Sequence, residues 1–312
     1  MDHNHFFPPH AGVTLAALAA QTGAELQDES HGGRIVRSVS PVSRAKDGDV
    51  CYILSRRNRE DLATCQATAI FCEKPIDLSL DRVKACLQVV RDTKAILMVG
   101  FNRRFDPHFV AVKGEISKGT IGTVEMVTIT SRDPGAPPVE YIARSGGIFR
   151  DMTIHDFDMA RFLLGEEVAE VSAQASVLVD PAIGKAGDFD SVQVMLRTAT
   201  GKMAVISNSR RATYGYDQRI EVHGSLGAVA AENQRPVSIE VASATGYTRP
   251  PLHDFFMTRY TEAYAAEIAA FVDAVGAKKA AAPSGEDGLL ALALAEAALK
   301  SVKEGRMVKV SE

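Results

Sequence analysis

The run from Ala95 to Phe101 is the strongest constraint on the fold, because it contains no polar side chain (AILMVGF). A strand that is apolar along its whole length is typical of a parallel sheet covered by helices on both faces. A shorter apolar run, Ala69 to Cys72, precedes it, and Leu78 to Thr93 between the two is predicted to be an amphipathic helix. Another helix is predicted from Asp106 to Lys118. This alternation of strand and helix indicates an α/β layer.

After this layer the chain changes to a series of strand-like runs, which are residues 123–131, 168–179, 191–198, 202–208, 219–222 and 237–241. Their grouping predicts a mainly antiparallel sheet. Two alanine-rich helices, Tyr260 to Val275 and Gly285 to Glu304, and a short strand at 307–310 close the chain. The predicted fold class is α/β plus α+β. It comprises a partial, N-terminally truncated Rossmann-like domain and a mainly antiparallel sheet domain, preceded by a small α/β N-terminal segment.

The segment Gly146 to Gly165 (GGIFRDMTIHDFDMARFLLG) carries the chemistry-bearing residues. Its apolar residues recur at helical spacing, and Asp151 and His155 are four apart, so on one helix they share a face. Asp158 lies three residues further, near the same face. A carboxylate beside an imidazole can orient it and stabilise its charged form, which suits acid–base catalysis. A purely structural histidine near a helix start is the alternative.

The net charge of −4 and the pI near 6.1 give no general attraction to nucleic acid or to acidic membranes. No apolar run is long enough to span a bilayer. The opening residues (MDHNHFFPPH) lack the pattern of a secretory signal, so we expect a cytoplasmic chain. The four cysteines, Cys51, Cys65, Cys72 and Cys86, form no CxxC pair. We therefore expect buried free thiols and no metal site.

Residues 1–69 resemble the N-terminal, non-repeat domain of the UDP-3-O-acylglucosamine N-acyltransferases of lipid A synthesis. The matching features are Val13-Thr14-Leu15-Ala16-Ala17-Leu18-Ala19, Gly23-Ala24-Glu25-Leu26, Gly48-Asp49-Val50, Tyr52 and Ala67-Thr68-Ala69-Ile70. The resemblance implies that Tyr52 stacks on uracil. That family transfers its acyl group on a β-helix of hexapeptide repeats, and no such repeat follows residue 70. The catalytic part of an acyltransferase is therefore absent from this sequence.

Residues 70–312 resemble the polyol-oxidising dehydrogenases related to glucose–fructose oxidoreductase, and among them the bacterial inositol 2-dehydrogenases. Five motifs carry the resemblance, in the same order along the chain. They are Glu73-Lys74-Pro75; Gly100-Phe101-Asn102-Arg103-Arg104-Phe105-Asp106-Pro107; Gly147 with Asp151-Met152-Thr153-Ile154-His155-Asp156; Asn208-Ser209-Arg210-Arg211-Ala212 with Tyr214-Gly215-Tyr216-Asp217; and Glu221-Val222-His223-Gly224-Ser225.

This second resemblance implies NAD as the cofactor and a polyol such as myo-inositol as the substrate. The implied catalytic residues are Lys74, which polarises the substrate oxygen, His155, which accepts the hydroxyl proton, and Asp151, which supports His155. The implied substrate-binding residues are Arg104, Asp133, Thr153 and Tyr216. The implied cofactor-binding residues are Glu73, Lys74, Pro75 and Asn102. The resemblance also implies a homo-oligomer, a tetramer in the family, that associates through the large sheet.

The sequence before residue 70 contains no GxGxxG, the loop that holds the pyrophosphate of a dinucleotide. We therefore predict three parts: an acyltransferase-like segment over 1–69, the remaining half of an NAD-binding domain over 70–121, and a substrate and oligomerisation domain over 122–312. A parallel sheet cut at this join is expected to leave an apolar edge uncovered, unless short strands of the N-terminal segment cover part of it. Three functions stay open: a dehydrogenase with weakened NAD binding, a nucleotide-sugar-binding module with an inert remnant, and a non-functional chimera that aggregates.

Overall fold

A computed structural model describes residues 69–310 and, before them, residues 13–14, 33, 35–36, 38–41 and 49–53. The chain divides into two compact units. Unit 1 comprises residues 1–101 and 264–289, and unit 2 comprises residues 102–263 and 290–312.

Unit 1 contains a four-stranded parallel sheet in the order β3-β4-β5-β6. Its strands are β3 (Ser38–Pro41), β4 (Asp49–Ile53), β5 (Ala69–Glu73) and β6 (Ile96–Gly100). Helix α3 (Leu80–Thr93) connects β5 to β6, as the apolar spacing predicts. Two short strands, β1 (Val13–Thr14) and β2 (Ile35–Val36), pair antiparallel.

The edge of β5 that we expected to be uncovered is occupied. Strand β4 pairs in parallel with β5, with Cys51 opposite Ile70 and Ile53 opposite Cys72. The expectation of a bare apolar edge is therefore wrong for these strands. Backbone pairing needs an extended segment of suitable length, and residues before the predicted join supply one.

Buried apolar side chains from α3 and β6, among them Val83, Leu87 and Met98, form the centre of unit 1. Helix α11 (Gly285–Glu304) begins against them. A Cβ at Gly285 would lie 2.3 Å from a methyl carbon of Leu87, so only glycine fits this close approach without movement. The thiol of Cys72 is buried and that of Cys86 is partly buried.

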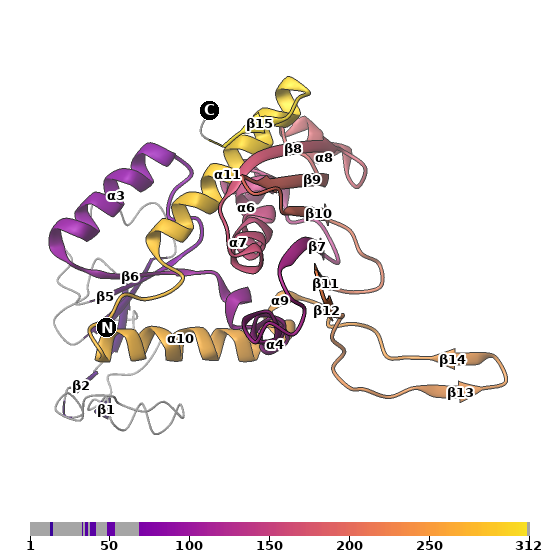
Figure 1. The fold of residues 1–312 in the computed structure, drawn as a ribbon, viewed down its shortest axis with the longest axis horizontal. Helices are drawn as coiled ribbons and strands as arrows, with labels where there is room; N and C mark the ends of the chain where they lie inside the picture. Colours follow the sequence, from indigo (N-terminus) through magenta and orange to yellow (C-terminus); the bar gives the residue numbers. More distant parts are fainter. Residues whose placement is uncertain are drawn as a thin grey trace, which may run out of the picture. The chain divides into compact units, whose positions relative to one another are not determined.

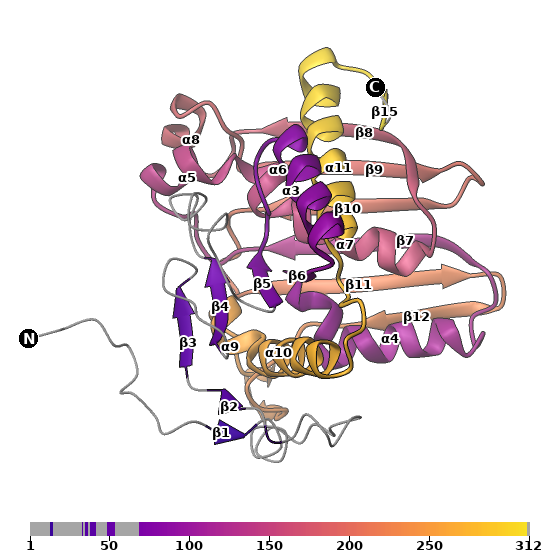
Figure 2. The ribbon, with the colours of Figure 1, turned by 90° about the vertical axis from the view of Figure 1, so that its left-hand side faces the viewer.

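Unit 2 is built on a seven-stranded sheet in the order β12-β11-β7-β10-β9-β8-β15, whose strands run across the view in Figure 2. The strands are β7 (Val124–Arg132), β8 (Val168–Ser176), β9 (Ser191–Thr198), β10 (Met203–Ser209), β11 (Asp217–Gly224), β12 (Gly227–Ala231) and β15 (Val308–Lys309). All neighbours pair antiparallel except β7 and β10, which are parallel. The prediction of a mainly antiparallel sheet is confirmed.

Helices cover one face of this sheet (Figure 1). The helices of unit 2 are α4 (Pro107–Ser117), α5 (Val139–Ser145), α6 (Ile148–Asp151), α7 (Thr153–Leu164), α8 (Pro181–Lys185) and α9 (Phe256–Arg259), with the 3-10 turn η4 (Asn102–Phe105). Of these, α4, α6 and α7 contribute side chains to the core against the sheet. Helix α10 (Thr261–Gly276) begins in unit 2, and α11 ends there. The side chains of β9 alternate between buried and exposed along the strand. Its apolar face therefore forms the core with α7 and α11.

Two predicted elements differ from the structure. The helix predicted through residues 150–164 is broken at Met152 into α6 and α7. The strand predicted at 237–241 is largely irregular, and only Val241 enters a strand, β13 (Val241–Ser243), which pairs with β14 (Gly246–Thr248) in an exposed hairpin. Among the residues that the structure describes, no helix has the length and apolar character needed to cross a membrane.

Candidate active site

Asp151 and His155 lie on either side of the break between α6 and α7. Asp151 is the last residue of α6, and its N–H donates to Gly147 O (3.0 Å). The N–H of His155 donates to Met152 O at 3.3 Å, so the first turn of α7 follows the last turn of α6 directly. Both side chains are partly exposed. The four-residue spacing therefore still places them about one turn apart, although the helix is interrupted.

Each carboxylate oxygen of Asp151 accepts a hydrogen bond. The Tyr141 hydroxyl donates to Oδ1 at 2.7 Å, and an Nη of Arg210 donates to Oδ2 at 3.2 Å. The Arg210 side chain is almost fully buried, and it pairs with Asp151 as a salt bridge. The sequence assigned no role to Tyr141 or Arg210. The alternation along the end of β10 could have indicated that Asn208, within the strand, and Arg210, just after it, share the inner side.

Asp133 follows the last residue of β7, and its N–H donates to Ser209 O at 2.9 Å. Burial raises the pKa of Asp133 to about 6. Arg210 and Arg103 act in the opposite direction, and the charge of Asp151 adds to the effect of burial. A carboxyl group with a pKa near neutrality, among two guanidinium groups, is typical of a functional site.

A buried polar network lies behind α7. Arg103 forms a salt bridge with Asp156 and donates to Ser131 Oγ at 3.0 Å. Asn208 donates to the other oxygen of Asp156 at 2.8 Å, and Ser131 donates to Gln218 at 2.8 Å. All five side chains are buried. Because a buried charge is stable only when it is paired, this network fixes the start of α7 against the sheet.

The four predicted substrate-binding residues occupy different environments. Arg104 forms a two-point salt bridge with Asp158 (2.8 and 2.6 Å) and lies over the Phe162 ring at 5.0 Å. Thr153 is fully buried, and its hydroxyl has no hydrogen-bond partner among the described residues.

Tyr216 is buried and packs edge-on against Tyr260, with ring centroids 5.9 Å apart. Burial raises the pKa of Tyr216 well above its ordinary value, so its hydroxyl stays protonated. Of the four residues, Asp133 and Tyr216 lie close enough to Arg103 for its positive charge to act against the rise in their pKa.

The predicted lysine and its neighbours belong to unit 1. Glu73 ends β5, and its carboxylate accepts the N–H of Lys74 at 3.3 Å. Pro75 follows through a cis peptide bond. A Cβ at Gly100, the register partner of Glu73 on β6, would lie 3.1 Å from the Glu73 carboxylate. Asn102 opens unit 2 and is buried at the start of η4.

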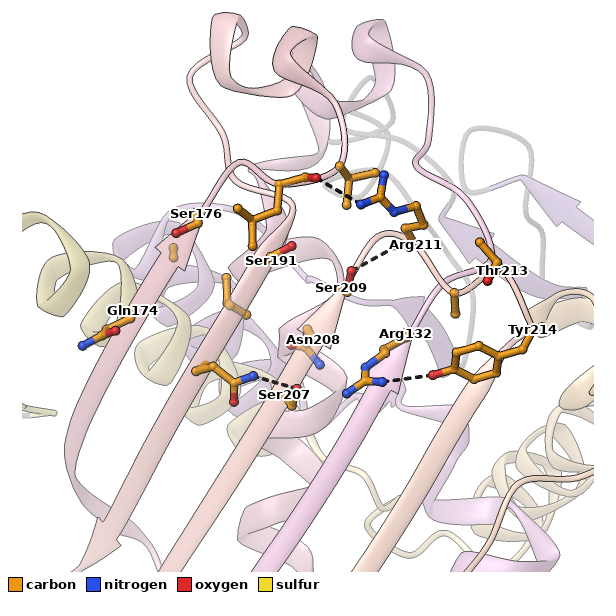
Figure 3. A pocket seen from close by; sticks show the side chains of 16 residues that line it. Arg132, Gln174, Ser176, Ser191, Ser207, Asn208, Ser209, Arg211, Thr213 and Tyr214 are labelled. Atoms are coloured by element: carbon orange, nitrogen blue, oxygen red, sulfur yellow. Dashed lines mark hydrogen bonds between the residues drawn. The ribbon is translucent and has the colours of Figure 1, made fainter.

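A separate cavity of about 500 Å³ lies at the ends of β7, β9 and β10, and its lining includes neither Asp151 nor His155. In this cavity Arg132 donates to the Tyr214 hydroxyl at 3.0 Å (Figure 3). Gln193, which also lines it, donates to the Ser207 hydroxyl at 2.8 Å. The described residues include no group of three or more His, Cys, Asp or Glu side chains that could hold a metal ion.

Comparison with known proteins assigns the chain to a family. A family model described as the GFO/IDH/MocA C-terminal domain matches residues 109–230. The inositol 2-dehydrogenase of Rhizobium meliloti (strain 1021) is 68% identical over 280 residues, which are 88% of this chain and 85% of that protein. The chain belongs to the inositol 2-dehydrogenase family. The myo-inositol 2-dehydrogenase of Thermotoga maritima is 50% identical over 243 residues, 78% of this chain and 73% of that one.

Solved structures of inositol dehydrogenases share the fold. A myo-inositol dehydrogenase from Corynebacterium glutamicum superposes with a TM-score of 0.80 at 40% identity, covering 94% of this chain and 86% of that one. A scyllo-inositol dehydrogenase from Lactobacillus casei, solved with bound NAD(H) and scyllo-inositol, has a TM-score of 0.79 at 27% identity. It covers 87% of this chain and 83% of that chain. The mixed α/β architecture predicted from the sequence is thus confirmed for this inositol 2-dehydrogenase family member.

The comparisons give the acyltransferase resemblance of residues 1–69 no support. Residues 70–312 are 243 of 312 residues, or 78% of the chain. The match to the Rhizobium enzyme covers 88% and therefore extends into residues 1–69. Part of the segment that we interpreted as foreign to the dehydrogenase thus aligns with a dehydrogenase.

Proposed function

We propose that this chain is an NAD-dependent inositol 2-dehydrogenase, which oxidises a secondary hydroxyl of myo-inositol to a ketone. The observation that carries the proposal is the 68% identity to the Rhizobium inositol 2-dehydrogenase over most of both chains. The position of Asp151 one turn before His155 supports it, because oxidation of an alcohol requires a base for the hydroxyl proton.

We assign the steps to three residues. His155 accepts the hydroxyl proton, and the Lys74 ammonium group stabilises the negative charge that develops on the same oxygen. The carboxylate of Asp151 stabilises the imidazolium that forms. NAD, when bound, supplies the acceptor for the hydride that leaves the carbinol carbon. Loss of one proton and one hydride converts the secondary alcohol to the ketone.

Glu73, Lys74, Pro75 and Asn102 would hold the cofactor. Glu73 is the last residue of the parallel strand β5, and Lys74 and Pro75 follow it, at the edge where open α/β sheets bind ligands. The absence of a side chain at Gly100 lets the Glu73 carboxylate pack closely over β6 at this edge. The sequence before residue 70 contains no GxGxxG. These residues therefore fit the nicotinamide end of the cofactor better than its pyrophosphate.

For the polyol we propose the pocket residues Arg104, Asp133, Thr153 and Tyr216. Asp133 is the one with the strongest physical support. Its side chain is partly exposed, and the positive charges of Arg103 and Arg210 act on it. Its carboxylate can therefore accept hydrogen bonds from substrate hydroxyls. Arg104 is already paired with Asp158, so we expect it to act through the position of α7.

The test is NADH formation with myo-inositol. Lys74→Ala and His155→Ala should each lower kcat/KM by about 100-fold or more, the size of a lost acid–base or electrostatic contribution. Lys84→Ala and His108→Ala are matched controls, since both residues are exposed and belong to α3 and α4. Full activity of either test variant would remove that residue from the mechanism.

Calorimetric titration separates this proposal from the alternatives. We expect NAD to bind and UDP-N-acetylglucosamine not to bind. Binding of the uridine nucleotide, lost on Tyr52→Ala, would instead support the nucleotide-sugar module. Binding of neither ligand, together with the absence of a cooperative unfolding transition, would support the non-functional chimera.

We further propose a homo-oligomer, a tetramer, that forms through the exposed face of the seven-stranded sheet. Met126, Met195, Met203 and Val205 are 43%, 54%, 40% and 38% exposed. They are neighbours, because Met203 lies opposite Met126 and Val205 opposite Met195. A contiguous apolar patch of this kind marks an interface. Light scattering after gel filtration should give an oligomer that Met195→Glu dissociates, and a monomeric parent chain would exclude it.

The division into parts at 1–69, 70–121 and 122–312 and the cytoplasmic location are also proposals. Limited proteolysis with mass spectrometry would test the first, because cleavage concentrates at exposed links between parts. Fractionation of the source cells would test the second.

A further inference from the structure

The carboxylate of Asp151 is held by two donors with opposite surroundings. Arg210, which donates to Oδ2, is 1% exposed and fixed within unit 2. Tyr141, which donates to Oδ1, is 44% exposed. One oxygen of Asp151 is therefore held from the interior, and the other is held from the side that faces solvent.

Tyr141 reaches Asp151 from α5, a helix of seven residues. Pro138 precedes this helix, and Gly146 ends it with φ +90°. Gly147 follows with φ +85°, and a Cβ there would lie 2.6 Å from an oxygen of Asp188. These two glycines let the backbone turn directly from α5 into α6. The chain thus returns within ten residues to place the Tyr141 hydroxyl on Asp151.

We propose that Tyr141 is a positioning residue, whose hydroxyl holds Asp151 ionised and correctly oriented beside His155. This inference rests on the proposed dehydrogenase function and extends it to a residue outside the assigned catalytic set. Tyr141 itself transfers no proton, because burial and the charge of Asp151 raise the pKa of its hydroxyl above the ordinary value. It remains a donor throughout the pH range of the reaction.

The balance of charges around Asp151 explains why a second donor matters. Among the described residues, Arg210 is a cation that favours its ionised form, and the carboxylates of Asp133 and Asp188 act against it. The described groups that act on Asp151 from neighbouring elements include Tyr141, Arg210, Asp133 and Asp188. A hydrogen bond to a charged group is stronger than one between neutral groups, so the tyrosine helps to offset the two carboxylates.

Tyr141→Phe tests the inference, since it removes only the hydroxyl. We expect kcat to fall about tenfold and the acidic limb of its pH profile to move up by about one unit, as expected for loss of a hydrogen bond to an ionised carboxylate. The KM for myo-inositol should change by less than about twofold, because the hydroxyl contacts Asp151 and not the substrate. Tyr247→Phe, at a residue 77% exposed on β14, is the matched control.

A readout independent of turnover is the pKa of Asp151, measured by carbon-13 NMR of its carboxyl group and assigned with Asp151→Asn. In Tyr141→Phe this pKa should rise by about one unit. An unchanged Asp151 pKa, or a raised KM with an unchanged pH profile, would overturn the inference. If the parent chain forms no NADH, the proposed function fails, and the NMR titration still decides whether Tyr141 controls Asp151.

Discussion

Glu267 offers a quantitative test of the structure of unit 1. Its side chain is fully buried in α10, and neither carboxylate oxygen has a hydrogen-bond partner in the described part of the chain. Burial, and then the charge of Glu73, raise its pKa to about 9. The geometry agrees with this coupling. Phe271, one helical turn along, contacts Phe71 with centroids 5.6 Å apart, and Glu73 lies two residues beyond Phe71 on the same face of β5.

The sign of the effect on stability follows from the proton balance. The folded chain keeps the Glu267 proton up to about pH 9, whereas the unfolded chain loses it near the ordinary value of 4.5. Between these values the unfolded state binds fewer protons, so the free energy of unfolding falls as pH rises, by about 1.4 kcal/mol per pH unit. From pH 5 to pH 8 this single group therefore removes about 4 kcal/mol.

Glu267→Gln keeps the size of the side chain and removes the titration. The unfolding free energy of the variant, minus that of the parent chain, should therefore increase by up to about 4 kcal/mol as the pH rises from 5 to 8. The assay is urea unfolding at several pH values, with Asp273→Asn as a control because Asp273 is exposed on the same helix. If the variant and the parent chain show the same pH dependence, the burial of Glu267 as a neutral acid is refuted.

Two further predictions concern unit 2. Gly224→Ala should cost about 3 kcal/mol in unfolding free energy, as overpacking does, because a Cβ there would lie 2.3 Å from the backbone oxygen of Ile121. Gly227→Ala, with no atom within 4 Å of its Cβ, should be nearly neutral, and equal costs would contradict the close approach. Asp156→Asn should cost about 3–5 kcal/mol, because Arg103 would keep a buried charge without a partner. Chemical unfolding measures this cost, with Glu221→Gln, an exposed position on β11, as the control. A loss of unfolding free energy below about 1 kcal/mol in Asp156→Asn would show that the ion pair does not stabilise the fold.

Local patterns predicted the elements whose residues alternate clearly. Strand β9 (Ser191–Thr198) and helix α11 (Gly285–Glu304) have the predicted bounds. Strand β12 (Gly227–Ala231) was missed because glycine and alanine have little preference for strands, and its pairing with β11 forms it. The apolar residues Val237 and Ile239 suggested a strand, yet both are more than half exposed, in the stretch leading to β13 and β14, which form a two-stranded sheet of their own.

Local sequence patterns likewise predicted one part of the candidate site and missed another. The spacing of Asp151 and His155 along one segment predicts that they lie about one turn apart, and the structure places them at the end of α6 and in the first turn of α7. The Tyr141–Asp151 contact depends on two glycines with positive φ, and Arg210 reaches Asp151 from 59 residues away. No periodicity in the sequence reports such contacts, because they arise from tertiary packing. The buried acid Glu267 was missed for a related reason, since only the packing of α10 on β5 shows that its carboxyl is enclosed.

The most direct test of the account is the fate of the hydrogen on carbon 2 of the substrate. The parent chain would be incubated with NAD and myo-inositol deuterated at that carbon, and the ketone and the reduced cofactor would be analysed by NMR and mass spectrometry. One deuterium should appear in the reduced cofactor for each ketone formed, and His155→Ala should form ketone at least about 100-fold more slowly. Ketone without label in the cofactor, or no reaction at saturating NAD and substrate, would contradict the account.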